Sequence, residues 1–272
     1  MKKILCTTDF SRQAAKVCRY AAQLAKQTNA RLYILHASHP SFTHTFDTEA
    51  MAFNENYVQT YYEAKLKRLA RRLEKSVDGG IGIEIINKTG FAVEVITEMA
   101  KQIRPDLLLM GTVGQLPRSP GIIGNLGSEM IGKSPVPIML VPPKAKFRAF
   151  ENVYMAVDVS EKVDAVALQQ MINSLKAFKV IINIFSMVRN PEALQVKEVI
   201  LSIREMLKDY PHVIDVVKGD NFVQAFLESA QIHKADLMIV FPKEHGWLER
   251  WFKGTNTEEL ILRTDLPMIA IA

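Results

Sequence analysis

The chain has few cysteines and no long apolar run. Only Cys6 and Cys18 occur among 272 residues, which excludes a disulfide-stapled secreted scaffold and gives no indication of a structural zinc site. The longest apolar stretch, near residues 180–188, is far below the ~18 residues that cross a bilayer. The opening MKKILC has an apolar core of only Ile4 and Leu5, whereas a secretory signal needs ~7–15 such residues. We therefore expect a cytoplasmic protein with reduced thiols.

Neither sign of charge dominates the sequence. Lys and Arg number 34 against 29 Asp and Glu, a net charge of +5, and so mild an excess does not require a nucleic acid partner. Hydrophobic residues at 48% and charged residues at 23% are typical of a globular chain and exclude disorder, collagen and coiled coil. The basic segment 64–75 is interpreted as a solvated helix face. Contact with a membrane surface or nucleic acid is the alternative, and we expect neither partner.

Four segments of the first half recur in the same order in the second half. The pairs are 2–11 with 151–160, 31–38 with 179–186, 105–112 with 235–242, and 134–142 with 264–272. Such ordered repetition indicates duplication, with about 19 extra residues between the second and third strands of the first half. We expect domains at residues 1–145 and 150–272, joined by a polar linker.

Short apolar runs alternate with helical patterns in each half. In the first half the runs predict buried parallel strands at 3–7, 32–37, 81–86, 107–110 and 137–141. Helices are expected after the N-cap Ser11, over 49–77 and 92–103, and from about Ser128. This order predicts an α/β fold made of two tandem, open, mostly parallel five-stranded sheets with helices on both faces.

Ligands of open parallel sheets bind beyond the carboxyl ends of the strands, where the strand order reverses. Thr7, Thr8 and Asp9 follow the first strand, and the fourth is followed by a stretch with five glycines between Gly111 and Gly127. Glycines let backbone N–H groups approach a phosphate, and a helix N-terminus adds partial positive charge. We favour phosphate binding over a loop without function.

A P-loop pattern occurs in the same stretch but in the wrong context. The letters of residues 127–134, GSEMIGKS, match it. A true P-loop follows a strand and opens a helix with its Lys-Ser pair, whereas Lys133 and Ser134 run into Pro135. We interpret Lys133 as a cation at the C-terminus of a helix.

Several of these segments together resemble the universal stress proteins in their tandem two-domain form. They are KKILCTTDFS, YILHA, LLLMGT with its glycine loop, GSEMI and SPVPIMLVP, and the resemblance covers nearly all of both halves. It implies an adenine nucleotide alpha hydrolase-like fold and a role in stress response. Nucleotide-binding members carry G-x2-G-x9-G-[ST]. Here Gly111 and Gly114 keep the first spacing, but 12 residues rather than 9 separate Gly114 from Gly127, as if three were inserted.

The resemblance implies a nucleotide-binding set in the first half. Its members are Thr7, Thr8, Asp9, Ala37, Met110, Gly111, Gly114, Gly127 and Ser128. Asp9 would read the adenine, Ala37 would line the ribose side, and the glycines with Ser128 would hold the phosphates. The residues alone allow an Asx turn or helix cap near Ser11 as an equal alternative for Asp9, and both roles can coexist.

The second half departs from this pattern. Asp158, Gly254 and Thr255 are its weaker candidates, because Phe241 and Glu244 replace the first two glycines and a carboxylate would repel phosphates. We rank the first-half site higher.

The sequence contains no persuasive catalytic set, and no G-x-S-x-G elbow occurs. His36, His39 and His44 form a loose cluster, but we expect no metal. The predicted function is binding of ATP or a related adenine nucleotide, with Mg²⁺ as an optional companion, in a sensor that signals through unidentified protein partners. The alternatives are an interaction module without nucleotide and a weak ATP hydrolase. The resemblance also implies an intramolecular pseudo-dimer joined by the last strands, with a homodimer as a further option.

Overall fold

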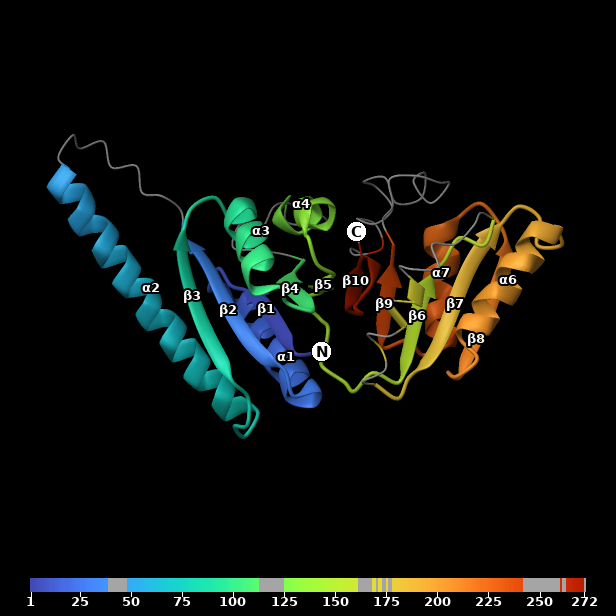
Figure 1. Cartoon of the computed structure of the whole chain (residues 1–272), viewed down its shortest axis with the longest axis horizontal. Helices are drawn as coiled ribbons and strands as arrows, with labels where there is room; N and C mark the ends of the chain where they lie inside the picture. Colours follow the sequence, from blue (N-terminus) through green and yellow to red (C-terminus); the bar gives the residue numbers. More distant parts are fainter. Residues whose placement is uncertain are drawn as a thin grey trace. The chain divides into compact units, whose positions relative to one another are not determined.

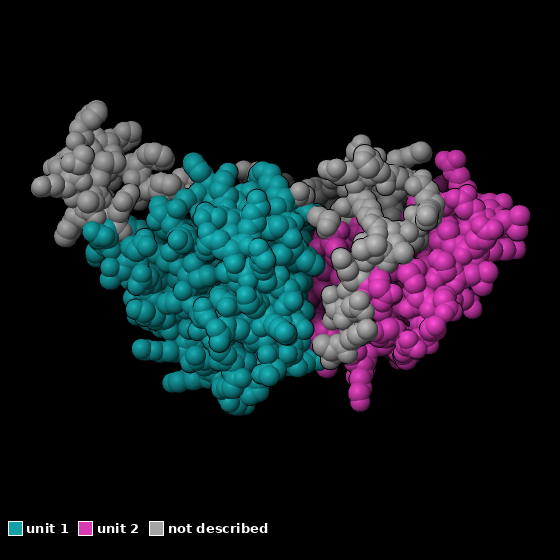
Figure 2. Space-filling view, viewed as in Figure 1, with its two compact units in different colours: residues 1–118, 124–138 teal, residues 119–123, 139–272 magenta. Residues whose placement is uncertain are grey.

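The chain forms two compact units, and among the described residues the first unit ends at Ile138 and the second begins at Met139 (Figure 2). The computed structural model describes most of both units. The described residues are 1–38, 48–112, 125–160, 168–169, 171–172, 175, 178–241, 260 and 263–271, with backbone alone at 48–55, 125, 128 and 132. Within this part of the chain no helix has both the length and the apolar character needed to cross a membrane.

The described residues of the first unit alternate between strands and helices, and β5 leads from this unit into the second (Figure 1). Its elements are β1 (Lys3–Thr7), α1 (Arg12–Thr28), β2 (Arg31–Ser38), α2 (Thr48–Ser76), β3 (Ile83–Thr89), α3 (Ala92–Ile103), β4 (Leu107–Gly111), α4 (Asn125–Lys133) and β5 (Ile138–Val141). The strand order is β3-β2-β1-β4-β5, and β1 pairs in parallel with both β2 and β4. Since β5 completes this order, we propose that the folding domains follow the sequence repeat, at 1–145 and 150–272.

Helices cover both faces of this sheet. α1 packs on β1, β2 and β4 and also against α2, whereas α3 packs on β2 and against α4. The central position of β1 explains its sequence, because Ile4, Leu5 and Cys6 are fully buried and a strand covered on both faces needs a continuous apolar run. The parallel sheet with helices on both faces, predicted from the sequence, is therefore confirmed.

Local signals placed most boundaries within one or two residues. Ser11 caps α1 as expected, and its Oγ accepts from Ala14 N. β3 differs more, because it covers Ile83–Thr89 instead of residues 81–86. It is an edge strand with a half-exposed burial pattern, so its second half can be polar and gives no apolar run. α4 begins at Asn125, three residues before the expected start at Ser128.

The second unit has the same topology. Its elements are β6 (Asn152–Ala156), β7 (Ile181–Val188), α6 (Leu194–Met206), β8 (His212–Lys218), α7 (Phe222–Ile232), β9 (Leu237–Val240) and β10 (Met268–Ala270). They are ordered β10-β9-β6-β7-β8, with all pairs described for β6, β7 and β9 parallel. Each β element of the first unit thus has a counterpart at the same place in the second.

The strand register corrects one of the repeat pairs. Thr7 lies beside Leu35 in the first unit, and Ala156 lies beside Phe185 in the second. The match to 31–38 is therefore β7 at 181–188, two residues later than the letter pattern suggested. His36 consequently corresponds to Ser186.

A carboxylate clamp is repeated in the two units. Asp106 Oδ2 accepts from Lys2 N at 2.6 Å and Lys3 N at 2.8 Å, and Asp236 Oδ2 accepts from Glu151 N and Asn152 N, both at 3.0 Å. Each carboxylate precedes the fourth strand and fixes the start of the first strand of its unit. Burial alone would raise the pKa of Asp106, but these N–H donors outweigh it and lower the pKa.

Candidate functional site

The first unit reverses its strand order between β1 and β4. The connections from β1 run to β2 and β3 on one side, and β4 and β5 lie on the other. Cys6 pairs with Leu109, so the two strands end side by side, and the residues after β1 come out next to Gly111 and Thr112. This edge is where an open parallel sheet offers a ligand site.

The loop after β1 is tightly bonded. Thr8 is buried and its N–H donates to Leu35 O at 2.9 Å, while its Oγ1 accepts from Phe10 N at 3.1 Å. Asp9 Oδ1 accepts from Ser11 N at 2.9 Å. That bond is the Asx turn considered as an alternative for Asp9, and it holds the carboxylate in the loop that follows β1.

The end of β2 supports this loop from the neighbouring strand. His36 is only 7% exposed, and its Nδ1 lies 2.8 Å from Thr8 O. A carbonyl oxygen can only accept, so Nδ1 carries the proton and donates. Ala37, expected on the ribose side, is the next residue and is half-buried.

The glycine-rich stretch after β4 is described only at its two ends. Gly111 closes β4, and the side chain of Met110 is 2% exposed in the core, so only its backbone could face a ligand. Gly114 lies outside the described residues. Gly127 is buried in the first turn of α4, and Ser128 follows it in the same helix. α4 starts from the β4 side, so its free N–H groups and partial positive charge lie at the carboxyl edge of the sheet.

The P-loop pattern is confirmed to be a coincidence of letters. Lys133 is the last residue of α4 and pairs with Glu129 at 2.6 Å, one turn back. Ser134 follows the helix instead of opening one, and its Oγ donates to Val136 O at 2.6 Å.

The candidates of the second unit are only partly described. Asp158 repeats the turn, because its Oδ1 accepts from Ser160 N at 2.8 Å and from Ser160 Oγ at 2.7 Å. Gly254 and Thr255 lie outside the described residues. Ser186, at the position of His36, accepts from Val159 N at 3.2 Å. The second unit thus keeps the turn but supports it with a different side chain.

Three residues at the first-unit edge were missed by sequence reasoning. The ring of Phe10 stacks on Tyr62 of α2, with centroids 5.8 Å apart and planes 9° apart, and Lys65 Nζ lies 4.4 Å from the Phe10 centroid. The spacing of Tyr62 and Lys65 by three residues places them on one helix face. That spacing was the only available signal, since nothing local connects α2 with the loop after β1.

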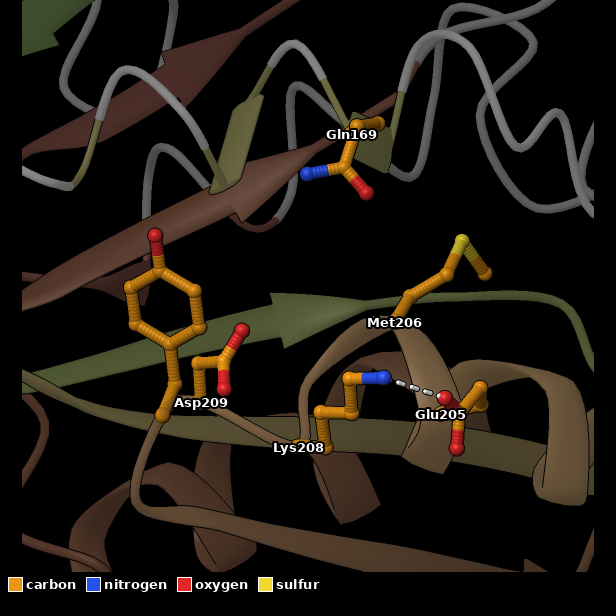
Figure 3. A pocket seen from close by; sticks show the side chains of 6 residues that line it. Gln169, Glu205, Met206, Lys208 and Asp209 are labelled. Carbon is orange, nitrogen blue, oxygen red and sulfur yellow. Dashed lines mark hydrogen bonds and ion pairs between the residues drawn. The ribbon is translucent and has the colours of Figure 1, made fainter.

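A separate cavity of about 590 Å³ lies in the second unit and is lined by residues around the end of α6 (Figure 3). Lys208 Nζ pairs there with Glu205 at 2.6 Å, and Met206 and Tyr210 complete that wall. Gln169 lies across the cavity from these residues. Residues 205–210 end α6 and lead into β8, so this wall is at the amino edge of the sheet, opposite to the edge where ligands of this fold bind. Among the described residues no group of three or more His, Cys, Asp or Glu could hold a metal ion.

Comparisons with known proteins agree on one family. The model of the universal stress protein family matches residues 1–142. A universal stress protein of Synechocystis is 27% identical over 141 residues, covering 52% of this chain and 85% of the relative. A universal stress protein E homolog of Haemophilus influenzae is 28% identical over 128 residues, which span 45% of this chain but only 40% of that protein. The crystal structure of a universal stress protein from Archaeoglobus fulgidus covers 98% of this chain and 95% of that chain with a TM-score of 0.73 at 18% identity, which shows a shared fold.

Proposed function

Because the chain belongs to the universal stress protein family, we propose that its first unit binds an adenine nucleotide, with ATP as the first candidate, at the carboxyl edge of β1 and β4. The protein acts in this proposal as a nucleotide-dependent sensor rather than as a catalyst. The observation that carries the proposal is the strand register, which brings the Asp9 loop beside Gly111 and Thr112 where the strand order reverses.

The chemistry of the edge suits a nucleotide at both ends. A fixed carboxylate such as Asp9 can accept from the N6 amine of adenine. The free N–H groups at the start of α4, with Gly127 and Ser128 in its first turns, suit phosphate oxygens. Gly111 and Gly114 would let the backbone come close to the same phosphates. A Mg²⁺ ion would accompany the phosphates and balance their charge.

The test is a calorimetric titration of nucleotide-free protein with ATP and Mg²⁺. We expect saturable binding, and stabilisation against heat of about 2.7 kcal/mol when ATP reaches a hundredfold excess over Kd. Asp9→Asn keeps a side-chain oxygen for the turn but removes the charge, so binding should be lost while the fold persists. Asp158→Asn is the matched control from the second unit and should leave binding intact.

The two alternatives give different results in the same experiment. No heat and no thermal stabilisation at millimolar ATP would refute the proposal and favour a protein-interaction module without nucleotide. Release of inorganic phosphate that depends on Mg²⁺ and is lost in Asp9→Asn would favour a weak ATP hydrolase over a sensor.

A further inference from the structure

A cluster of three rings and one cation covers the Asp9 loop from the α2 side. Phe10 and His36 have ring centroids 4.6 Å apart, and His36 and Tyr62 have centroids 4.3 Å apart. Lys65 Nζ lies 4.4 Å from the centroid of Phe10 and 5.6 Å from that of Tyr62, within the range of a cation–π contact. We call these four residues the Phe10 cluster.

The backbone at the centre of this cluster is strained. Phe10 has φ of +60°, in the left-handed region that bulky residues avoid. Adopting that region costs a non-glycine residue about a fivefold to thirtyfold loss of population. The side chains of Tyr62, Lys65 and His36 contact the Phe10 ring. The backbone N–H of Phe10 donates to Thr8 Oγ1. These contacts stabilise a conformation that the local sequence does not favour.

His36, at the end of β2, supports the same loop with one ring nitrogen, while among the described residues its second ring nitrogen has no hydrogen-bond partner. Its Nδ1 donates to Thr8 O, while its Nε2 is buried and meets no hydrogen-bonding group among the described residues. An unpaired buried acceptor is destabilising. Such strained and unpaired groups persist where the surrounding structure over-determines them, and they concentrate at functional sites.

The described residues of the second unit hold no counterpart of this arrangement. Val159 stands where the first unit has Phe10 and has no positive φ, and Ser186 replaces His36. α2 has 29 residues and α6 only 13. The two helices end at similar distances before β3 and β8, so the extra length is the N-terminal part of α2, which carries Tyr62. The Phe10 cluster is thus specific to the half with the better nucleotide candidates.

We propose that Tyr62 and Lys65 of α2 are positioning residues, which hold Phe10 in its left-handed conformation and thereby fix the Asp9 carboxylate for the adenine nucleotide. They act through Phe10 and make no contact with the ligand. The inference rests on the proposed function, and it assigns to the extended α2 of the first unit the role of preorganising the nucleotide loop.

The experiment compares ATP affinity among full-length variants. Tyr62→Leu removes the stacked ring and should weaken ATP binding about fivefold to thirtyfold, the population factor of the left-handed state. Lys65→Met removes only the cation and should weaken it about twofold to fivefold. Tyr57→Leu is the matched control, because Tyr57 is 67% exposed on the same helix, and should leave affinity unchanged.

A rescue variant separates positioning from general damage to the fold. Glycine adopts positive φ without strain, so Phe10→Gly combined with Tyr62→Leu should recover most of the lost affinity. Loss of affinity without rescue would overturn the proposal, as would a Tyr62→Leu variant that binds ATP like the parent protein.

Hydrogen exchange without nucleotide keeps the inference testable even if ATP does not bind. A peptide covering residues 7–14 should exchange faster in Tyr62→Leu than in the parent protein, and the thermal unfolding curve shows whether the variant is folded. No ATP binding by the parent protein refutes the proposed function alone. Unchanged exchange in folded Tyr62→Leu refutes the positioning role.

Discussion

His36 makes the stability of the first unit depend on pH, and the sign follows from its surroundings. Burial is the largest influence and lowers the pKa of His36 below 6.5. The hydrogen bond to the Thr8 carbonyl raises the pKa, the nearby charge of Lys65 lowers it further, and the charge of Asp9 raises it. The pKa of His36 is then lower in the folded state than in the unfolded state. At pH values between these two pKa values the unfolded chain binds more protons, so acid favours unfolding. Stability is therefore full above about pH 6.5 and is lost as the pH falls below that value.

The perturbation is His36→Asn, which removes the titratable ring but leaves an amide that can donate to Thr8 O. Losing the ring contacts with Phe10 and Tyr62 should cost about 1–2 kcal/mol at pH 7.5. Between pH 7.5 and 5.5 the parent protein should lose up to about 1.4 kcal/mol that the variant does not lose. For a chain of this size that is roughly 3–6 °C in the unfolding temperature.

Calorimetric melts at the two pH values, without nucleotide, measure this difference. His212→Asn is the matched control, because His212 Nδ1 also lies 2.9 Å from a backbone carbonyl, that of Tyr210, but in the second unit and with partial exposure. The variant His36→Asn should flatten the pH dependence of the unfolding temperature, and His212→Asn shows the effect of replacing a carbonyl-bonded histidine outside the Phe10 cluster. Equal pH slopes in the parent protein and His36→Asn would refute the buried, neutral state assigned to His36.

Four further substitutions test the scaffold around the site. Asp106→Ala and Asp236→Ala should each lower the free energy of unfolding, measured in urea, by about 1 kcal/mol. The reason is that each carboxylate accepts two backbone N–H bonds in a partly exposed place. If the two losses differed by more than about 2 kcal/mol, the two clamps would not be equivalent. Lys133→Met should leave ATP affinity within about twofold because the residue ends α4 and is not a phosphate-binding lysine, whereas a true P-loop lysine would be indispensable. Ser11→Ala should lower the free energy of unfolding by about 1 kcal/mol through loss of the α1 cap, and an unchanged melting temperature would argue against it.

How much of the fold the sequence predicts depends on where each element lies. β1 is central and buried on both faces, so its sequence is a continuous apolar run, and the bounds predicted from that run agree with the observed strand. β3 lies at the edge, where polar residues are tolerated, and its C-terminal part was missed. The repeat alignment matched residues 31–38 to a segment two residues before β7. In an apolar strand a shift of two residues keeps each side chain on the same face, so the sequence pattern does not distinguish the two registers.

The Phe10 cluster could not be predicted in the same way. The residues that meet at the loop, Phe10, His36 and Tyr62, are distant along the chain and come from three different elements. A left-handed phenylalanine has no local sequence signal, since its own preference opposes that conformation. Tertiary packing decides such positions, and for that reason they are informative about function.

The duplication itself separates what builds the scaffold from what builds the site. Asp9 and Asp158 both accept from the serine N–H two residues later, so the carboxylate is needed for the turn in either unit and does not by itself indicate a ligand. The support of that turn differs, because His36 with the extended α2 acts in the first unit and Ser186 in the second. The aspartate turn therefore does not distinguish the two units. Within the part of the chain that the structure describes, the strained Phe10 and its supporting rings occur in the first unit alone, and this asymmetry favours the first unit as the nucleotide site.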